Sequence, residues 1–168
     1  SVDITMNQTY LIPKDIILTS QNSNIAQHII QKCNDLNPDF NIKFFDDNLI
    51  IEFLKKEYDD TYVNSYKCIN FGMYKADFFR YCYLYKYGGY YFDIDIEPIL
   101  SIKEIIDYKT NYCSVLSTIN KHIFQAVLSA NKNNPIIKMC INDMLHYGSN
   151  IGIDPPNKPP YNGHPTKC

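Results

Sequence analysis

The sequence predicts an α/β fold with a mainly parallel sheet flanked by helices. Short apolar runs of strand length alternate with longer segments of helical periodicity. Strands that alternate with helices usually form a parallel sheet covered on both faces. With 168 residues, 45% of them hydrophobic, the chain can bury one core. We expect one domain over residues 1–147 and an irregular tail over residues 148–168, which hold five of the nine prolines.

The first part of the chain is predicted to form strand, helix, strand and helix. Asp15–Ser20 is a short apolar run of strand length. Ser23 can cap a helix whose apolar residues recur at spacings of three and four. Asn41–Phe45 alternates as a second strand, and Asp46 or Asp47 can cap the next helix.

The remaining part is predicted to continue this alternation. The longest helix has no internal Gly or Pro, and Met73, Phe78, Cys82 and Tyr85 fall close to one of its faces. The expected elements are a helix at Gly72–Tyr87, a strand at Tyr90–Asp93, a short helix capped by Ser101, a strand at Tyr112–Ile119, and helices at Lys121–Ala130 and Pro135–His146.

Composition and charge exclude several function classes. The net charge of −2 gives no basic excess for a phosphate backbone, so nucleic-acid binding is not expected. The apolar stretches fall far short of the roughly 20 residues that cross a bilayer, and we expect no transmembrane segment. Ser1–Thr9 lacks the pattern of a secretory signal, but the sequence does not begin with Met, so the cytoplasm and a membrane-associated lumen both stay open as locations. The six cysteines show no metal-binding spacing and are interpreted as mostly free thiols.

The strongest functional signal is the pair of carboxylates Asp93 and Asp95. Side chains two apart on a strand point the same way, so the two can share one ligand. Mg²⁺ and Mn²⁺ prefer oxygen ligands, commonly one or two carboxylates with substrate phosphates and water. The carboxyl end of a strand is also where ligands of open α/β sheets bind.

Two other interpretations of this pair stay open. Asp93 can cap the following turn while Asp95 is solvated. A D-x-D motif after a strand also occurs in phosphatases of the haloacid-dehalogenase type. We expect Asp93→Ala to leave the fold intact, because a carboxylate that only binds a ligand contributes little packing, and a large drop in melting temperature would favour the capping interpretation.

Two neighbouring features allow both a structural and a functional interpretation. Asp77 and Arg80 are three apart and share a helix face, as in a surface ion pair or in an anchor for a nucleotide. Gly88 and Gly89 can end a helix and form a turn, or let the backbone approach a phosphate closely.

Taken together, these residues resemble a known family. The segment KADFFRYCYLYKYGGYYFDID at Lys75–Asp95 is similar to the DXD-containing sugar-binding region of glycosyltransferase family 32. IPKDII at Ile12–Ile17 and NPDFNIKFFDD at Asn37–Asp47 resemble the first two strand regions of that family. The resemblance covers Ile12 to about Ile141.

The resemblance implies a GT-A-type, Rossmann-like fold, a UDP- or GDP-sugar donor, Mn²⁺ or Mg²⁺, and retention of anomeric configuration. Asp93 and Asp95 would be the catalytic and metal-binding residues, with Asp95 the more direct metal ligand. The acceptor would be a glycan or protein hydroxyl. The donor-binding residues would be Asp77, Arg80, Gly89, Tyr91 and Asp93.

The leading hypothesis is therefore a metal-dependent glycosyltransferase domain. The alternative is a truncated or inactive glycosyltransferase that binds nucleotide-sugar without transfer.

Overall fold

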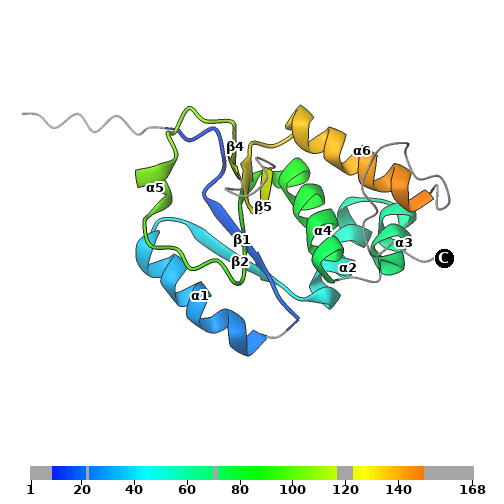
Figure 1. Cartoon of the computed structure of the whole chain (residues 1–168), viewed down its shortest axis with the longest axis horizontal. Coiled ribbons are helices and arrows are strands. Elements are labelled where there is room, and N and C mark those ends of the chain that lie inside the picture. Colours follow the sequence, from blue (N-terminus) through cyan, green and yellow to red (C-terminus); the bar gives the residue numbers. More distant parts are fainter. Residues whose placement is uncertain (1–8, 22, 70–71, 117–122, 150–168) are drawn as a thin grey trace, which may run out of the picture.

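The computed structural model describes residues 9–21, 23–69, 72–116 and 123–149. Within these ranges the chain forms one five-stranded sheet with helices on both faces (Figure 1). The elements in chain order are β1 (Asp15–Thr19), α1 (Ser23–Leu36), β2 (Asn41–Phe45), α2 (Asp47–Glu57), α3 (Asp60–Cys68), α4 (Gly72–Tyr87), β3 (Gly89–Asp93), α5 (Ile102–Ile105), β4 (Tyr112–Leu116), β5 (Ile123–Ala130) and α6 (Pro135–Ser149).

Four of the five described strands run in the same direction. The strand order is β2-β1-β3-β5-β4. β1 is parallel to both β2 and β3, whereas β5 is antiparallel to both β3 and β4. Because β4 is antiparallel to β5, it points the same way as β3. The predicted α/β fold with a mainly parallel sheet flanked by helices is confirmed.

Two apolar cores, one on each face of the sheet, hold the layers together. Ile17 and Tyr91 pack in the core that contains α2, α3, α4 and α6. Their neighbours Ile16 and Tyr90 pack in the core that contains residues of α1 and α5. Successive side chains of a strand point to opposite faces, so each strand contributes to both cores. Figure 1 shows the two helical layers on either side of the sheet.

Residues 121–130, predicted as a helix, form a strand over the part that the structure describes. β5 lies between β3 and β4 and pairs with both. Leu128 and Ala130, two apart, lie in the same core, as expected for a strand. The helix prediction was wrong because a short apolar run fits both helix and strand, and only pairing with distant strands decides between them. Lys121 and His122 lie outside the described residues.

α4 is buried on all sides along part of its length, and not on one face as predicted. Residues 78–84 are all buried, because α4 lies between the sheet and α2, α3 and α6. Met73 is 68% exposed and does not belong to the predicted apolar face. The pattern predicts no element at residues 60–68, yet these form α3, whose buried residues Val63 and Tyr66 give only a weak amphipathic signal.

The last predicted elements agree with the structure within the residues it describes. The strand predicted at Tyr112–Ile119 is present as β4, and residues 117–119 lie outside the described ranges. α6 continues to Ser149, three residues past the predicted end at His146. Residues 150–168, the larger part of the predicted tail, also lie outside the described ranges.

None of the helices in the described ranges has the length and hydrophobicity of a membrane span. Cys33, Cys82, Cys113 and Cys140 carry free thiols.

Gly89 begins β3 at a position where a side chain has no room. Its φ of +131° lies in a region that L-residues rarely adopt, and a Cβ would lie 2.6 Å from Ile17 Cδ1 and 2.8 Å from the Asp15 carbonyl oxygen. Backbone strain and overpacking each cost about 1–3 kcal/mol, so Gly89→Ala is expected to lower the free energy of unfolding by about 2–5 kcal/mol. Denaturant unfolding followed by circular dichroism measures this loss.

Gly72→Ala is the matched control, because a Cβ at Gly72 meets no atom within 4 Å. Its free energy of unfolding should change by less than about 0.5 kcal/mol. If Gly89→Ala were as stable as Gly72→Ala, the close approach of β1 and β3 at this position would be contradicted.

Candidate functional site

The carboxyl ends of the parallel strands β1, β2 and β3 meet at one edge of the sheet. Thr19, the last residue of β1, pairs with Phe45 of β2 on one side and with Asp93 of β3 on the other. Ligands of open α/β sheets bind outside this end of the strands. The structure therefore places the first carboxylate of the D-x-D motif at the expected edge.

A buried arginine joins α4 to this edge. Arg80 is 2% exposed, and its Nη2 lies 3.0 Å from Asp77 Oδ1 and 2.9 Å from Asp93 Oδ1. Its Nη1 donates a hydrogen bond to the backbone carbonyl of Gln125 in β5. Its Cζ lies 4.4 Å from the centroid of the Tyr91 ring, while its buried Nε–H has no hydrogen-bond partner among the described residues. A buried charge requires such pairing, so the surface ion-pair interpretation is wrong for Arg80.

The two carboxylates are more exposed than the arginine that holds them. The Asp77 side chain is 24% exposed and the Asp93 side chain is 32% exposed. A ligand outside the strand ends can therefore reach the carboxylates, whereas Arg80 lies behind them. In this arrangement Arg80 contacts both carboxylates and holds them in place.

Tyr91 fixes the orientation of the Asp93 carboxylate by a hydrogen bond. Its hydroxyl donates to Asp93 Oδ1 at 2.9 Å and lies 3.0 Å from Thr19 Oγ1. Burial is the largest cause that raises the pKa of Tyr91, so the phenol keeps its proton and remains a donor. The Thr19 hydroxyl is then left to donate to Tyr91.

Burial also affects the pKa of Asp77. It is the largest cause that raises the pKa of Asp77 above its ordinary value, the Arg80 guanidinium opposes it, and the nearby Asp93 carboxylate adds to it. The two acids therefore share one cation at a site that is partly removed from water.

These contacts overturn the expected stability of Asp93→Ala. Asp93 accepts hydrogen bonds from both Arg80 and Tyr91. Removing it leaves the buried guanidinium with a single carboxylate partner, so the variant is now expected to lose stability.

Asp95 lies in a turn and not on the strand. β3 ends at Asp93, and the turn that follows is closed by a 3.0 Å hydrogen bond from the Ile96 N–H to the Asp93 carbonyl oxygen. Strand alternation, from which the shared direction of the two acids was predicted, therefore does not extend to Asp95. The Asp95 side chain is exposed and makes no hydrogen bond or ion pair within the described residues.

Asp93 and Asp95 carry oxygen donors of the kind that hard divalent cations prefer. No group of three or more His, Cys, Asp or Glu in the described ranges is placed to hold a metal ion. Mg²⁺ and Mn²⁺ are commonly bound by one or two carboxylates, with substrate phosphates and water as the other ligands. Asp93 and Asp95 supply that number of carboxylates.

Gly89 is not brought to this cluster. It pairs with Ala130 at the start of β3 and lies beside Asp15, at the opposite end of the strand from Asp93. Its role in the described structure is to allow the close packing of β1 and β3.

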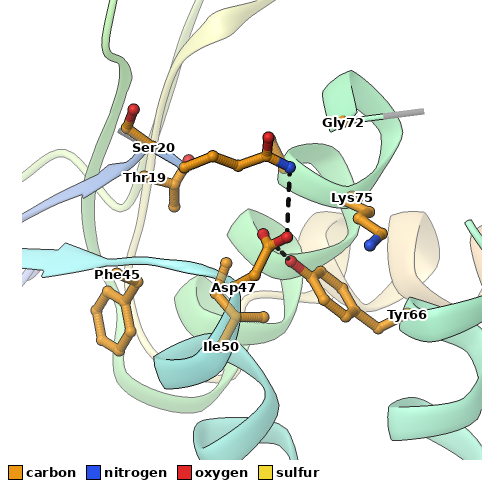
Figure 2. Close-up of a pocket in the computed structure, with 10 residues that line it drawn as sticks. Thr19, Ser20, Phe45, Asp47, Ile50, Tyr66, Gly72 and Lys75 are labelled. Carbon is orange, nitrogen blue, oxygen red and sulfur yellow. Dashed lines mark hydrogen bonds between the residues drawn. The ribbon is translucent and has the colours of Figure 1, made fainter. Parts of the chain in front are cut away.

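An open pocket of about 380 Å³ lies at the same edge of the sheet. Figure 2 shows that its side chains come from the ends of β1 and β2 and from α2, α3 and α4. The residues that line it are Thr19, Ser20, Gln21, Phe45, Asp47, Ile50, Tyr66, Gly72, Lys75 and Ala76.

Sequence reasoning did not identify this pocket. It treated Asp46 and Asp47 only as helix caps, and the Asp46 carboxylate does accept from the Leu49 N–H at 2.9 Å. Asp47 instead lines the pocket. The available signal was position, because the residues that follow β1 and β2 lie at the carboxyl ends of parallel strands.

Comparisons with known proteins match the D-x-D region and the fold. The family model described as "Glycosyltransferase sugar-binding region containing DXD motif" matches residues 23–112, a range that includes α4, β3 and both acids of the D-x-D motif. A solved structure, the PaToxG Glycosyltransferase, superposes with a TM-score of 0.63 at 16% identity, covering 82% of this chain and 62% of that chain. At this identity the likeness shows the fold.

Two curated yeast proteins are similar in sequence. The chain is 26% identical over 151 residues to Inositol phosphoceramide mannosyltransferase 3 of Schizosaccharomyces pombe, covering 88% of this chain and 41% of the relative. It is 34% identical over 100 residues to Mannosyl phosphorylinositol ceramide synthase SUR1 of Saccharomyces cerevisiae, covering 54% of this chain and 26% of the relative. The chain thus spans less than half the length of these relatives.

Proposed function

Because this chain belongs to the family of the glycosyltransferase sugar-binding region containing the DXD motif, we propose that it transfers a sugar from a nucleotide-sugar to an acceptor hydroxyl. The donor is a UDP- or GDP-sugar, and the acceptor is a glycan or a protein. The names of the two yeast relatives add mannose as a candidate sugar and inositol phosphoceramide as a candidate acceptor. Retention of configuration and a GT-A-type fold are proposed on the family resemblance.

The observation that carries the proposal is the cluster around Arg80, which lies beside the pocket. Arg80 holds Asp77 and Asp93 at 3.0 and 2.9 Å, and the last residue of β1 both lines the pocket and pairs with Asp93. Carboxylates that keep free lone pairs accept hydrogen bonds from sugar or ribose hydroxyls. Asp77 and Asp93 would thus orient the donor, and Arg80 and Tyr91 would fix their geometry.

The metal site belongs to the same proposal. Asp95, with Asp93, would hold Mn²⁺ or Mg²⁺ together with diphosphate oxygens. When bound, the cation neutralises the negative charge that develops on the leaving diphosphate. Asp95 suits this role because it is exposed and has no protein partner among the described residues.

Thermal stabilisation of the purified chain by UDP- and GDP-sugars, with and without Mn²⁺, tests the proposal. A ligand that binds only the folded state at about 100 times its Kd stabilises by about 2.7 kcal/mol. For a chain of this size that raises the melting temperature by roughly 5–10 °C. We expect such a rise for one nucleotide, in the presence of Mn²⁺ only.

Asp143→Ala is the control, because Asp143 is an exposed acid on α6. It should retain the full shift. The absence of a shift with every nucleotide would contradict the proposal. A metal-dependent shift without transfer or donor hydrolysis would instead favour a protein that binds nucleotide-sugar without turnover.

A further inference from the structure

The pocket beside the Arg80 cluster presents a carboxylate in a fixed orientation. Asp47 Oδ1 accepts a 2.9 Å hydrogen bond from the Tyr66 hydroxyl, and Asp47 Oδ2 accepts one of 3.3 Å from Gln21 Nε2 (Figure 2). Tyr66 is 1% exposed, so its hydroxyl is a rigid donor. Each carboxylate oxygen can accept about two hydrogen bonds, so both oxygens of Asp47 keep acceptor capacity for a ligand.

The other groups of the pocket include both apolar and polar side chains. Phe45 and Ile50 contribute apolar walls. Lys75 also lines the pocket, and its ammonium lies 5.1 Å from the centroid of the Tyr66 ring. The pocket therefore offers two adjacent acceptor oxygens on Asp47 and a cationic donor on Lys75. Its volume of about 380 Å³ is in the range of small-ligand pockets.

Among the nucleobases, guanine matches this set of groups. Its N1–H and N2–H groups are adjacent donors that can pair with the two oxygens of one carboxylate, and its O6 is an acceptor for an ammonium. Uracil has one N–H between two carbonyl groups, so the second carboxylate oxygen would face a carbonyl. Adenine and cytosine present one amino group beside an unprotonated ring nitrogen. Each of these bases would leave one Asp47 oxygen without a donor from the ligand, or would place a ligand acceptor against it.

We propose that Asp47 selects guanine, so that the donor of this enzyme is a GDP-sugar. This inference rests on the proposed function and deepens it by choosing between the two donor classes. A site built to hydrogen-bond its ligand rejects analogues that lack the matching groups, because hydrogen bonds between the site and the ligand are then lost.

Isothermal titration calorimetry of the full chain with nucleoside diphosphates in Mn²⁺ tests the inference. The probes are GDP, UDP, inosine diphosphate, which lacks the N2 amino group, and xanthosine diphosphate, which has a carbonyl in its place. A bidentate pair with a base discriminates by roughly 10- to 100-fold. GDP should therefore bind at least about tenfold more tightly than UDP and inosine diphosphate.

Asp47→Asn replaces one of the two acceptor oxygens with an N–H₂ donor. The amide oxygen still accepts from N1–H, but the amide N–H₂ now faces position 2 of the base and requires a carbonyl there. The variant should bind GDP at least about tenfold more weakly than the wild type, and should bind xanthosine diphosphate more tightly than GDP.

Two further variants separate base recognition from charge and folding. Asp46→Asn removes the same charge one residue away and retains a good helix cap, so it should keep the preference for GDP over UDP. Tyr66→Phe removes the hydroxyl that orients Asp47 but leaves the carboxylate in place. Tyr66→Phe should reduce the preference for GDP over UDP. If Asp47→Asn does not fold, this change in preference tests the inference instead.

The outcomes distinguish this inference from the proposed function. UDP binding as tight as GDP binding, or an equal loss of GDP and UDP affinity in Asp47→Asn, would overturn guanine selection and leave the proposed function standing. In the second case Asp47 would act on the ribose. The absence of metal-dependent binding of every nucleotide would overturn both.

Discussion

Replacing Asp95 with alanine is expected to lower the rate of sugar transfer by about 100- to 1000-fold, the loss found when a group that stabilises transition-state charge is removed. Asp95 is exposed and has no partner within the described residues. Its removal should therefore change stability by less than about 0.5 kcal/mol, or the melting temperature by less than about 2 °C. Transfer and donor hydrolysis are measured at saturating Mn²⁺, and unfolding is followed on the same samples.

Asp93→Ala is compared with Asp95→Ala in the same measurements of activity and stability. Asp93 accepts from Arg80 and Tyr91, so its removal should reduce both activity and stability. Asp143→Ala should change neither. If Asp95→Ala lost as much stability as Asp93→Ala, Asp95 would have a structural partner and its assignment as the freer metal ligand would be wrong.

The fold could be predicted from the sequence where local signals and packing agree. β1, α1 and β2 follow from apolar runs of strand length and from a stripe of apolar residues at helical spacing. β5 was predicted as a helix because its residues fit both states, and its pairing with β3 is a contact between segments about 38 residues apart that no local pattern contains. α3 has only a weak amphipathic pattern and is stabilised by the helices that pack on it. These contacts between helices are likewise absent from the local sequence pattern.

The candidate site was predictable in its chemistry and less so in its geometry. The motif located Asp77, Arg80, Tyr91 and Asp93, which the structure brings together. Sequence spacing could not show that Arg80 is buried behind the carboxylates, because its burial depends on β5. Nor could it place Asp47 in a pocket, since a helix-capping position explains an acidic residue equally well.

Replacing Arg80 with methionine is expected to lower the free energy of unfolding by about 3 kcal/mol, at the lower end of the cost of breaking a buried ion pair. The lower end applies because both carboxylates reach solvent. For a domain of this size the melting temperature should fall by roughly 6–12 °C. Lys86→Met is the control on the same helix. Lys86 lies 3.5 Å from the Glu57 carboxylate at a more exposed position, where an ion pair contributes less than about 1 kcal/mol.

The loss of stability in Arg80→Met should come mainly from Asp77 and Asp93, because the substitution leaves their carboxylates without a cation. Burial already raises the pKa of Asp77, and loss of the guanidinium should raise it further. A carboxyl group whose folded pKa exceeds its unfolded value stabilises the folded state more as the pH falls, so the deficit of Arg80→Met should shrink on acidification from neutral pH.

Adding Asp77→Asn to Arg80→Met should recover part of the loss at neutral pH, because one unpaired charge is removed. The interaction energy of the two substitutions should then exceed about 1 kcal/mol in a double-mutant cycle. If the two losses simply add, and the deficit does not change with pH, then Arg80 stabilises the fold by packing on Tyr91 and by its bond to Gln125. The two carboxylates would in that case be positioned independently of it, and Arg80 could be replaced without disturbing the donor site.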